Sequence, residues 1–188
     1  MIRRFGSLRT IYSASVEALR EALFDAGHFT GIDGSRDVAA EIADAIAAAR
    51  RLAEAASREV MLGVPLHTGS FEFRQYLVNR LGSRREECVL VLFFNGEGVY
   101  IAEDLYAGGR RSECLIPLRR TVRRAFDLDA RRIVLAHNHP SGAARPSGDD
   151  IAATARFRQV VEPLEIRLDD HCIVAGNAVA SMKALGIF

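Results

Sequence analysis

The sequence predicts an α/β protein, in which helices flank a mixed sheet and a small all-helical segment precedes it. Residues 88–94 form a continuous β-branched and aromatic run, which is typical of a strand buried on both faces. After residue 66, short apolar runs alternate with segments of helical periodicity, and both tight turns and helical crossovers join them. The chain has 188 residues, enough for one ordinary domain with a small appendage.

The composition is that of a soluble globular protein. Hydrophobic residues make up 49% of the chain and mean hydropathy is +0.04, which excludes a disordered or fibrous chain. The longest uncharged apolar run, 88–94, is far shorter than the roughly 20 residues of a membrane-spanning helix, so no membrane association is expected. The three cysteines, Cys88, Cys114 and Cys172, form no CxxC motif, and no signal core follows Met1. A reducing, cytoplasmic location is therefore expected.

The first part of the chain is expected to be helical. Ser15 can cap the first helix, and the second is rich in alanine. A break with three glycines in eight residues separates them. The two expected helices cover residues 15–24 and 35–57. We place the domain boundary near residue 66, which gives an N-terminal helical region, 1–66, and a second domain, 67–188.

The second domain is expected to alternate between helices and strands. Ser70 and Pro117 suit helix starts, and Asn95-Gly96 is a strong signal for a tight turn between two strands. No GxGxxG or GxxxxGK[ST] motif occurs, so the sequence offers no loop for binding phosphate. The expected elements are helices over 70–80, 117–126, 147–161 and 178–185, and strands over 88–94, 99–106, 132–136 and 166–174.

The charge distribution favours no nucleic-acid partner. Net charge is +1, from 25 basic and 24 acidic residues. One local excess of arginine stands out on the expected helix 117–126, where four arginines crowd one or two turns. They are Arg119, Arg120, Arg123 and Arg124. Since nearly every basic residue of this chain is an arginine, we interpret this cluster as a solvated helix face.

The segment that carries chemistry begins where the strand 132–136 ends. His137 and His139 are two residues apart, so both rings project from one face of the strand. Asp150 lies in the first turn of the next expected helix and can reach the same place. Two histidines and one carboxylate leave an open position on a tetrahedral zinc ion, as in a catalytic site. Alternatively, Ser147 and Asp150 form only a capping box, and the histidines are structural.

The pattern His137-x-His139-x₇-Ser147-x-x-Asp150 resembles the JAMM (MPN+) signature of zinc-dependent hydrolases and isopeptidases. The longer string HNHPSG, followed by Pro146-Ser147, and the tail 168–176 resemble the bacterial RadC family. The resemblance covers most of residues 67–188 and extends weakly to residues 4–8. It implies a JAMM/MPN-like fold, a mixed sheet flanked by helices with a layering like that of cytidine deaminases.

The resemblance also implies roles for single residues. His137, His139 and Asp150 would bind Zn²⁺, and Ser147 would donate a hydrogen bond to the oxyanion of the substrate. A glutamate from an earlier strand would take a proton from the metal-activated water and pass it to the leaving amine. We choose Glu103 for this role from its context, Ile-Ala-Glu-Asp-Leu. Glu97, in the turn before that strand, and Asp104, which points to the opposite face, are the alternatives.

The resemblance therefore implies a zinc-dependent metallohydrolase that cleaves an amide or isopeptide bond in a peptide or protein substrate. The alternative is a DNA-repair-associated accessory module, which keeps a metal site but has little turnover. Family members carry a tight, basic helix-hairpin-helix loop, whereas the loop 31–34 here is looser and acidic. This departure from the family pattern speaks against DNA binding by the N-terminal helical region, so DNA is kept only as the alternative partner. His171, in the tail, is expected to be a core residue or to contact one of the metal ligands without binding the metal itself.

Overall fold

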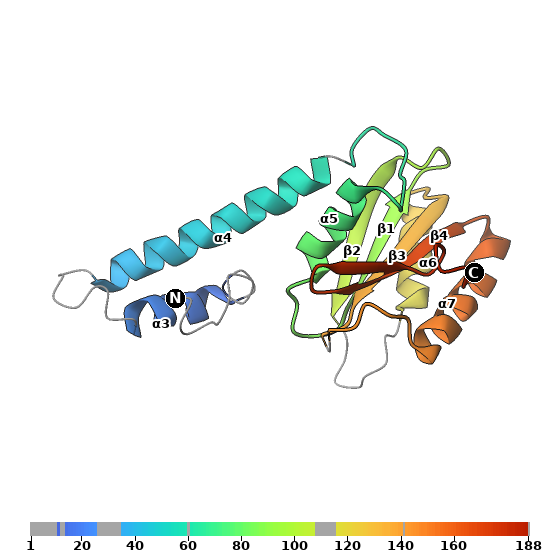
Figure 1. Cartoon of the computed structure of the whole chain (residues 1–188). Helices are drawn as coiled ribbons and strands as arrows, with labels where there is room; N and C mark the ends of the chain where they lie inside the picture. Colours follow the sequence, from blue (N-terminus) through green and yellow to red (C-terminus); the bar gives the residue numbers. More distant parts are fainter. Residues whose placement is uncertain are drawn as a thin grey trace. The chain divides into compact units, whose positions relative to one another are not determined.

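The computed structural model describes residues 11, 14–25, 35–59, 61–107, 116–140 and 142–187. The chain divides into two compact units, Met1–Ala56 and Ser57–Phe188. The first unit contains α3 (Val16–Asp25) and all but the end of α4 (Ser35–Glu59), shown in blue in Figure 1. Both predicted helices are confirmed, and the backbone N–H of Ala18 donates to Ser15 Oγ at 3.1 Å, as a helix cap requires. The predicted glycine break and residues 4–8 lie outside the described residues.

The second unit is built on a mixed sheet, as the sequence predicts, and within the described residues this sheet has five strands. The strand order is β2-β1-β3-β4-β5, with β3 and β4 parallel and the other neighbours antiparallel. The strands are β1 (Cys88–Phe94), β2 (Tyr100–Ala107), β3 (Arg132–Asn138), β4 (Arg167–Ala175) and β5 (Ala178–Ser181). The helices are α5 (Phe71–Leu81), α6 (Leu118–Asp127), α7 (Gly148–Val161) and the short η1 (Glu162–Leu164).

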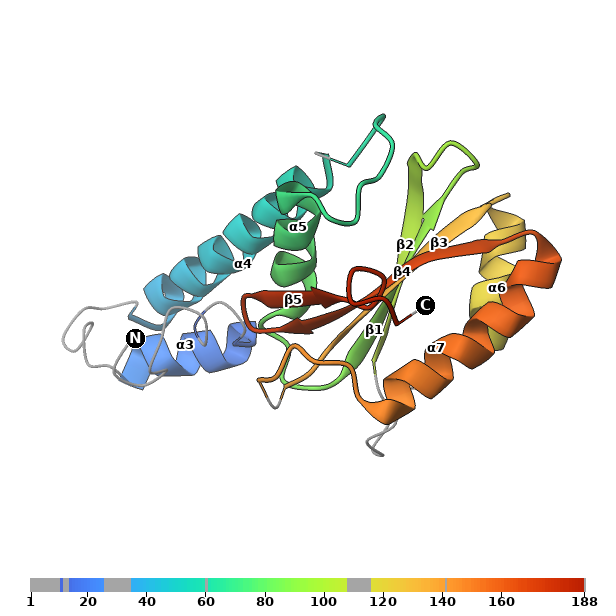
Figure 2. The ribbon, with the colours of Figure 1, turned by 45° about the vertical axis from the view of Figure 1, so that its right-hand side comes forward.

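Helices cover both faces of this sheet, so the second unit has three layers (Figures 1 and 2). On the α5 face, Phe73, Tyr76 and Leu77 pack against side chains of β1 and β3, among them Leu92 and Val134. On the α6/α7 face, Ala125, Phe157 and Val161 pack against the side chains that alternate with these, which are Val89, Val91, Ile133 and Leu135. Because successive side chains of a strand point to opposite faces, the register of each strand decides which face a residue serves.

The predicted closing helix over 178–185 is wrong. Ala178–Ser181 instead forms β5, which returns antiparallel along β4 with Ala175 opposite Ala178. The turn is Gly176-Asn177, and Gly176 has a φ of +58°, which glycine adopts without strain. Pairing with the edge of β4 therefore outweighs the local helix preference of the alanines, which is worth only tenths of a kcal/mol per residue.

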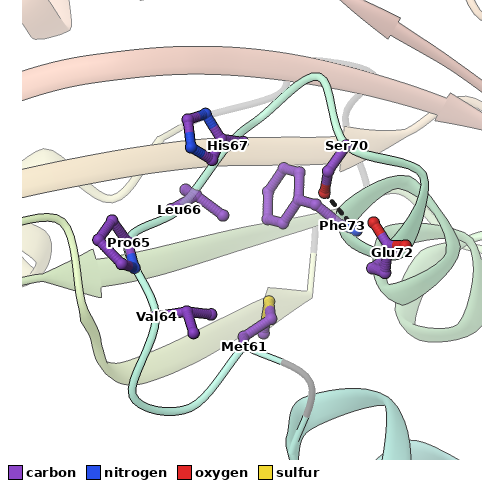
Figure 3. Close-up of a pocket in the computed structure, with 8 residues that line it drawn as sticks. All are labelled: Met61, Val64, Pro65, Leu66, His67, Ser70, Glu72 and Phe73. Carbon is purple, nitrogen blue, oxygen red and sulfur yellow. Dashed lines mark hydrogen bonds between the residues drawn. The ribbon is translucent and has the colours of Figure 1, made fainter.

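A small apolar pocket lies beside α5 (Figure 3). Its wall is the loop before α5, which is held to the β1–β2 turn by a hydrogen bond from Leu66 N to Gly98 O. The lining residues are Met61, Val64, Pro65, Leu66, His67, Ser70, Glu72 and Phe73. Within the described ranges, no helix is long and apolar enough to cross a membrane.

Candidate metal centre

Two histidines stand at the end of β3. His137 is opposite Val89 of β1 and Ile173 of β4, so its side chain lies on the α6/α7 face, where it is fully buried. His139 follows two residues later, and its backbone N–H donates to Val174 O at 2.8 Å. This bond continues the parallel ladder beyond the strand. As predicted, the two imidazoles project from the same face, and their ring centroids are 4.7 Å apart.

The residue between them anchors the strand end. Asn138 Oδ1 accepts from the backbone N–H of Cys88 at 2.8 Å, and Asn138 Nδ2 donates to Glu86 O at 3.0 Å. The side chain of Asn138 is buried. These two bonds hold the segment that enters β1 directly beside the histidines.

Helix α7 brings the carboxylate. Ser147 is its N-cap, and Ser147 Oγ accepts from Asp150 N at 3.1 Å while Asp150 Oδ2 accepts from Ser147 N at 2.7 Å. The predicted capping box is therefore present. Ser147 Oγ also donates to Asp150 Oδ2 at 2.6 Å. The capping box thus fixes the Asp150 carboxylate at the first turn of the helix, with 4% of the side chain exposed.

The three predicted ligands come together. His137 Nε2 lies 2.9 Å from His139 Nε2 and 3.1 Å from Asp150 Oδ1, and His139 Nε2 lies 3.4 Å from Asp150 Oδ2. Ligand atoms 2.0–2.1 Å from a tetrahedral zinc ion are about 3.3 Å apart, so this spacing suits one ion held by all three. Among the described residues, these are the three side chains that could hold a metal together.

The site has one open side. The side chains of His137 and Asp150 are 0% and 4% exposed, whereas that of His139 is 16% exposed. A water or a substrate can therefore approach along the His139 side, and the other two ligands are shielded. Three protein ligands with one accessible position is the arrangement of a catalytic zinc site, because a structural site is closed by four.

The electrostatics keep the carboxylate ionised. Burial alone would raise the pKa of Asp150, but hydrogen bonds from His137 and Ser147 outweigh it and hold this pKa far below its usual range. Asp150 is therefore a carboxylate in the metal-free site. A carboxylate with two neutral imidazoles carries a net charge of −1, which favours a divalent cation.

A third histidine lies behind the cluster. His171 Nε2 is 2.9 Å from His137 Nδ1, and His171 Nδ1 is 2.6 Å from Thr154 Oγ1. Burial, together with the nearby charge of His137, lowers the pKa of His171 to about 3. His171 therefore stays neutral at physiological pH. It contacts the ring of His137 on the side away from His139 and Asp150, so it is placed to orient that imidazole.

Most of the second unit matches a known domain family. The family model described as "RadC-like JAB domain" matches residues 68–187, nearly the whole second unit. The chain belongs to the RadC-like JAB domain family. The resemblance inferred from the sequence is confirmed, and with it the JAMM type of this domain.

Proteins of several bacteria are similar to this RadC-like chain over most of its length. A UPF0758 protein of Bordetella petrii is 30% identical over 187 residues, covering 100% of this chain and 77% of the relative. A UPF0758 protein of Vibrio atlanticus is 33% identical over 186 residues, covering 99% and 77%. One from Polaromonas is 37% identical over 150 residues, covering 79% and 64%. The similarity therefore includes the helices before the family domain.

The structure does not bring Glu103 to the metal centre, so this part of the sequence-based interpretation needs correction. Glu103 is opposite Leu92, and Leu92 is opposite Val134, which places it on the α5 face, with the sheet between it and His137. There its Oε1 is 2.7 Å from Arg80 and 3.2 Å from Arg58. This buried ion pair accounts for the presence of an acid inside an apolar strand.

The alternatives weighed with Glu103 are not beside the cluster either. Asp104 is on the α6/α7 face, but it is opposite Val91, two strands from β3 and two residues along. That separation is about 10 Å across the sheet and 7 Å along it. Asp104 Oδ2 instead accepts from Tyr106 Oη at 3.0 Å. Glu97 lies in the turn at the far end of β1 and is exposed.

The sequence reasoning missed a nearer acid, Glu87. It immediately precedes β1, two residues before Val89, the partner of His137. Side chains two residues apart on a strand share a face, so Glu87 belongs to the face of His137 and to the position opposite His139. It is half-buried. The signal that could have found Glu87 is the alternation of side chains in the apolar run 88–94. Counted back by two from Val89, it identifies Glu87, but only once β3 is known to be the partner strand.

Proposed function

We propose that this RadC-like chain is a zinc-dependent hydrolase that cleaves an amide or isopeptide bond in a peptide or protein. One observation carries the proposal, the convergence of His137 Nε2, His139 Nε2 and an Asp150 carboxylate oxygen within 3.4 Å of one another. The donor set suits zinc, because imidazole and carboxylate are its usual ligands in hydrolases. The partly exposed side at His139 gives the substrate access.

The three ligands have separate tasks in this proposal. Zinc, when bound, lowers the pKa of a coordinated water toward neutrality and so supplies a nucleophile. His137 and Asp150 are rigid, since one is packed in the sheet and the other is fixed by the capping box. His139 lies at the open side and adjoins the substrate. Preorganised ligands of this kind favour the metal over solvent without a rearrangement.

We propose Glu87 as the general base in place of Glu103. The β1–β3 register, continued two residues beyond the pair Val89–His137, sets Glu87 opposite His139, and this supports a role for its carboxylate in taking a proton from the attacking water at the open side. Its half-buried setting lets it exchange protons with solvent or with a leaving amine. Asn138 accepts from the backbone N–H of Cys88 and donates to the backbone oxygen of Glu86, and these bonds on either side of Glu87 support a fixed position for it.

Ser147 has a supporting role in the resting site. Its hydroxyl proton is directed at Asp150 Oδ2, at 2.6 Å, so it holds a ligand in place. Its predicted role as a donor to the substrate oxyanion requires the hydroxyl to turn away from Asp150. We retain that role as part of the proposal, since Ser147 is the hydroxyl nearest the metal ligands along α7.

Turnover by the zinc-loaded full chain tests the proposal. The probes are short peptides joined by normal peptide bonds and by lysine isopeptide bonds, with products followed by mass spectrometry. The expected result is cleavage that a chelator abolishes and zinc restores, and that Glu87→Gln removes. The matched control is Glu86→Gln, the same change at the exposed neighbouring residue. Full zinc loading without cleavage of any probe, combined with salt-dependent DNA binding, would favour the accessory module instead.

The cellular setting belongs to the same proposal. Cys88 and Cys172 are buried free thiols. Buried thiols without a disulfide partner support a reducing compartment, so we propose that the reaction takes place in the cytoplasm.

A further inference from the structure

A chain of three short contacts connects two of the proposed metal ligands through the core. His137 Nδ1 is 2.9 Å from His171 Nε2, and His171 Nδ1 is 2.6 Å from Thr154 Oγ1. Thr154 Oγ1 is also 2.6 Å from the backbone oxygen of Asp150. The side chains of His137, His171 and Thr154 are each at most 1% exposed. The chain thus begins on the ring of one ligand and ends on the backbone of another.

The positions of the protons in this chain can be worked out from the threonine. A backbone carbonyl only accepts, so the contact between Thr154 Oγ1 and Asp150 O is a hydrogen bond only if the hydroxyl proton lies between them. At 2.6 Å, two oxygens without a proton between them would repel each other. The hydroxyl has one proton. Thr154 Oγ1 must therefore accept from His171 Nδ1–H.

The remaining positions follow. A neutral imidazole with its proton on Nδ1 has an unprotonated Nε2, so His171 Nε2 accepts from His137 Nδ1–H. His137 therefore keeps its proton on Nδ1, and Nε2, the atom that faces His139 and Asp150, is the nitrogen that gives up its proton when His137 becomes a neutral ligand. The opposite arrangement would put a proton on His137 Nε2 and block it as a ligand.

We propose that Thr154 and His171 are positioning residues, which together fix His137 in the tautomer that can bind a metal. The proposal rests on the metal site proposed above and adds two residues to it. Neither touches the metal or the substrate. Each acts through the ring of His137, whose centroid is 4.9 Å from that of His171. The distal N–H of a ligating histidine ordinarily donates to a carboxylate, a carbonyl or a water, and here a second imidazole, that of His171, is the acceptor.

A packing role alone would predict different results. If His171 and Thr154 only filled space, Thr154→Val would be nearly neutral, because valine has the shape of threonine and loses only the hydroxyl. If they fix the tautomer, valine leaves His171 Nδ1–H without an acceptor in a fully buried place, and His171 can then present either nitrogen to His137.

The first measurement is the tautomer of His171 in the metal-free full chain, by two-bond ¹H–¹⁵N correlation at a pH where imidazoles are neutral. The expected signature is a proton on Nδ1 of His171. A proton on Nε2 of His171 would overturn the proposal. This readout does not depend on zinc, so it tests the proposal even if the proposed hydrolase function fails.

The second measurement is zinc affinity by competition with a chelator. Changes to outer neighbours of a metal ligand weaken binding roughly 10–100-fold, and we expect Thr154→Val at the lower end of that range. Thr154→Ser, which restores the hydroxyl, should bind zinc within about twofold of the unchanged chain. The matched control is Thr121→Val, at a fully buried threonine of α6 on the same face of the sheet. Unchanged affinity in Thr154→Val, or a loss that Thr154→Ser does not restore, would refute the positioning role. If the unchanged chain bound no zinc, the proposed function would fail, and the tautomer alone would decide the positioning role.

Discussion

Both faces of the sheet bury a carboxylate, but the side chains that contact this carboxylate differ between the two faces. On the α5 face, the Glu103 carboxylate meets two guanidinium groups, those of Arg80 and Arg58. That cluster carries a net positive charge and repels a cation. On the α6/α7 face, the Asp150 carboxylate meets the imidazoles of His137 and His139, which are neutral when they act as ligands. With neutral imidazoles the second cluster has a net negative charge, which favours a cation, and its nitrogen and oxygen donors suit a metal ion. The groups that contact a buried acid therefore indicate the role of that acid better than its burial does.

The largest expected effect is the loss of zinc when a proposed ligand on the α6/α7 face is removed. His139→Ala leaves two protein ligands, so the zinc content of the purified full chain should fall from about one ion per chain to near zero. Metal analysis by mass spectrometry measures it. His67→Ala is the matched control, an exposed histidine on the loop before α5, and should keep the full content. Full zinc content in His139→Ala would show that the bound zinc ion lies elsewhere in the protein.

The next largest effect is expected from removing the proposed proton acceptor, Glu87, on the α6/α7 face. Glu87→Gln should lower the turnover of a cleaved probe by about 10²–10⁴-fold and leave zinc content unchanged, because an amide cannot accept the proton. Glu103→Gln should keep turnover within a few-fold, since the sheet separates it from the ligands. The reverse result, with Glu103→Gln inactive and Glu87→Gln active, would restore the assignment made from sequence.

Acid should destabilise the metal-free protein through the α6/α7 face. His171 has a folded-state pKa of about 3 against 6.5 when unfolded, so the unfolded chain takes up a proton first as pH falls. The stability from this group is complete above pH 6.5 and declines progressively toward pH 3, by an amount on the order of a few kcal/mol. Thermal melting from pH 7 to 4.5 measures it. In His171→Gln the decline over this window should be clearly shallower; an equal slope would assign it to other groups.

The ion pair on the α5 face should affect stability and nothing else. Glu103→Gln leaves Arg80 and Arg58 without their carboxylate, and we expect a loss of about 1–3 kcal/mol in the free energy of unfolding. Urea denaturation with zinc removed measures it. Glu97→Gln, in the exposed turn, is the matched control and should be neutral. A change in zinc affinity in Glu103→Gln would contradict the separation of the two faces.

The smallest effect on the metal site should come from removing the first unit. A fragment of residues 57–188 keeps Arg58 and the buried Met61, and should melt cooperatively and bind zinc like the full chain. A fragment that starts at the predicted boundary, residue 67, loses both, so it should melt at a lower temperature with the same zinc content. Equal melting of the two fragments would favour the predicted boundary, and loss of zinc from either would contradict the independence of the site.

Most of the fold could be predicted because its signals are local. The cap residues Ser15 and Ser70, the apolar run 88–94 and the Asn95-Gly96 turn each act over a few residues, and the structure places elements where they predict them. The error at 178–185 has the opposite cause. Ala178–Ser181 is a strand because the edge of β4 is available to it, and the sequence of the segment does not contain that information.

The site divides in the same way. The sequence by itself determined that His137 and His139 share a face, because they alternate on one strand, and that Asp150 follows in a capped first turn, because Ser147 precedes it by three residues. It also determined that Glu103 and Asp104 face opposite ways. Only the tertiary structure decided which of these faces is that of His137, and that the position opposite His139 belongs to Glu87. The reason is that alternation within a strand is local, whereas the face it serves depends on the order and register of β2, β1 and β3, which are set by contacts between distant segments.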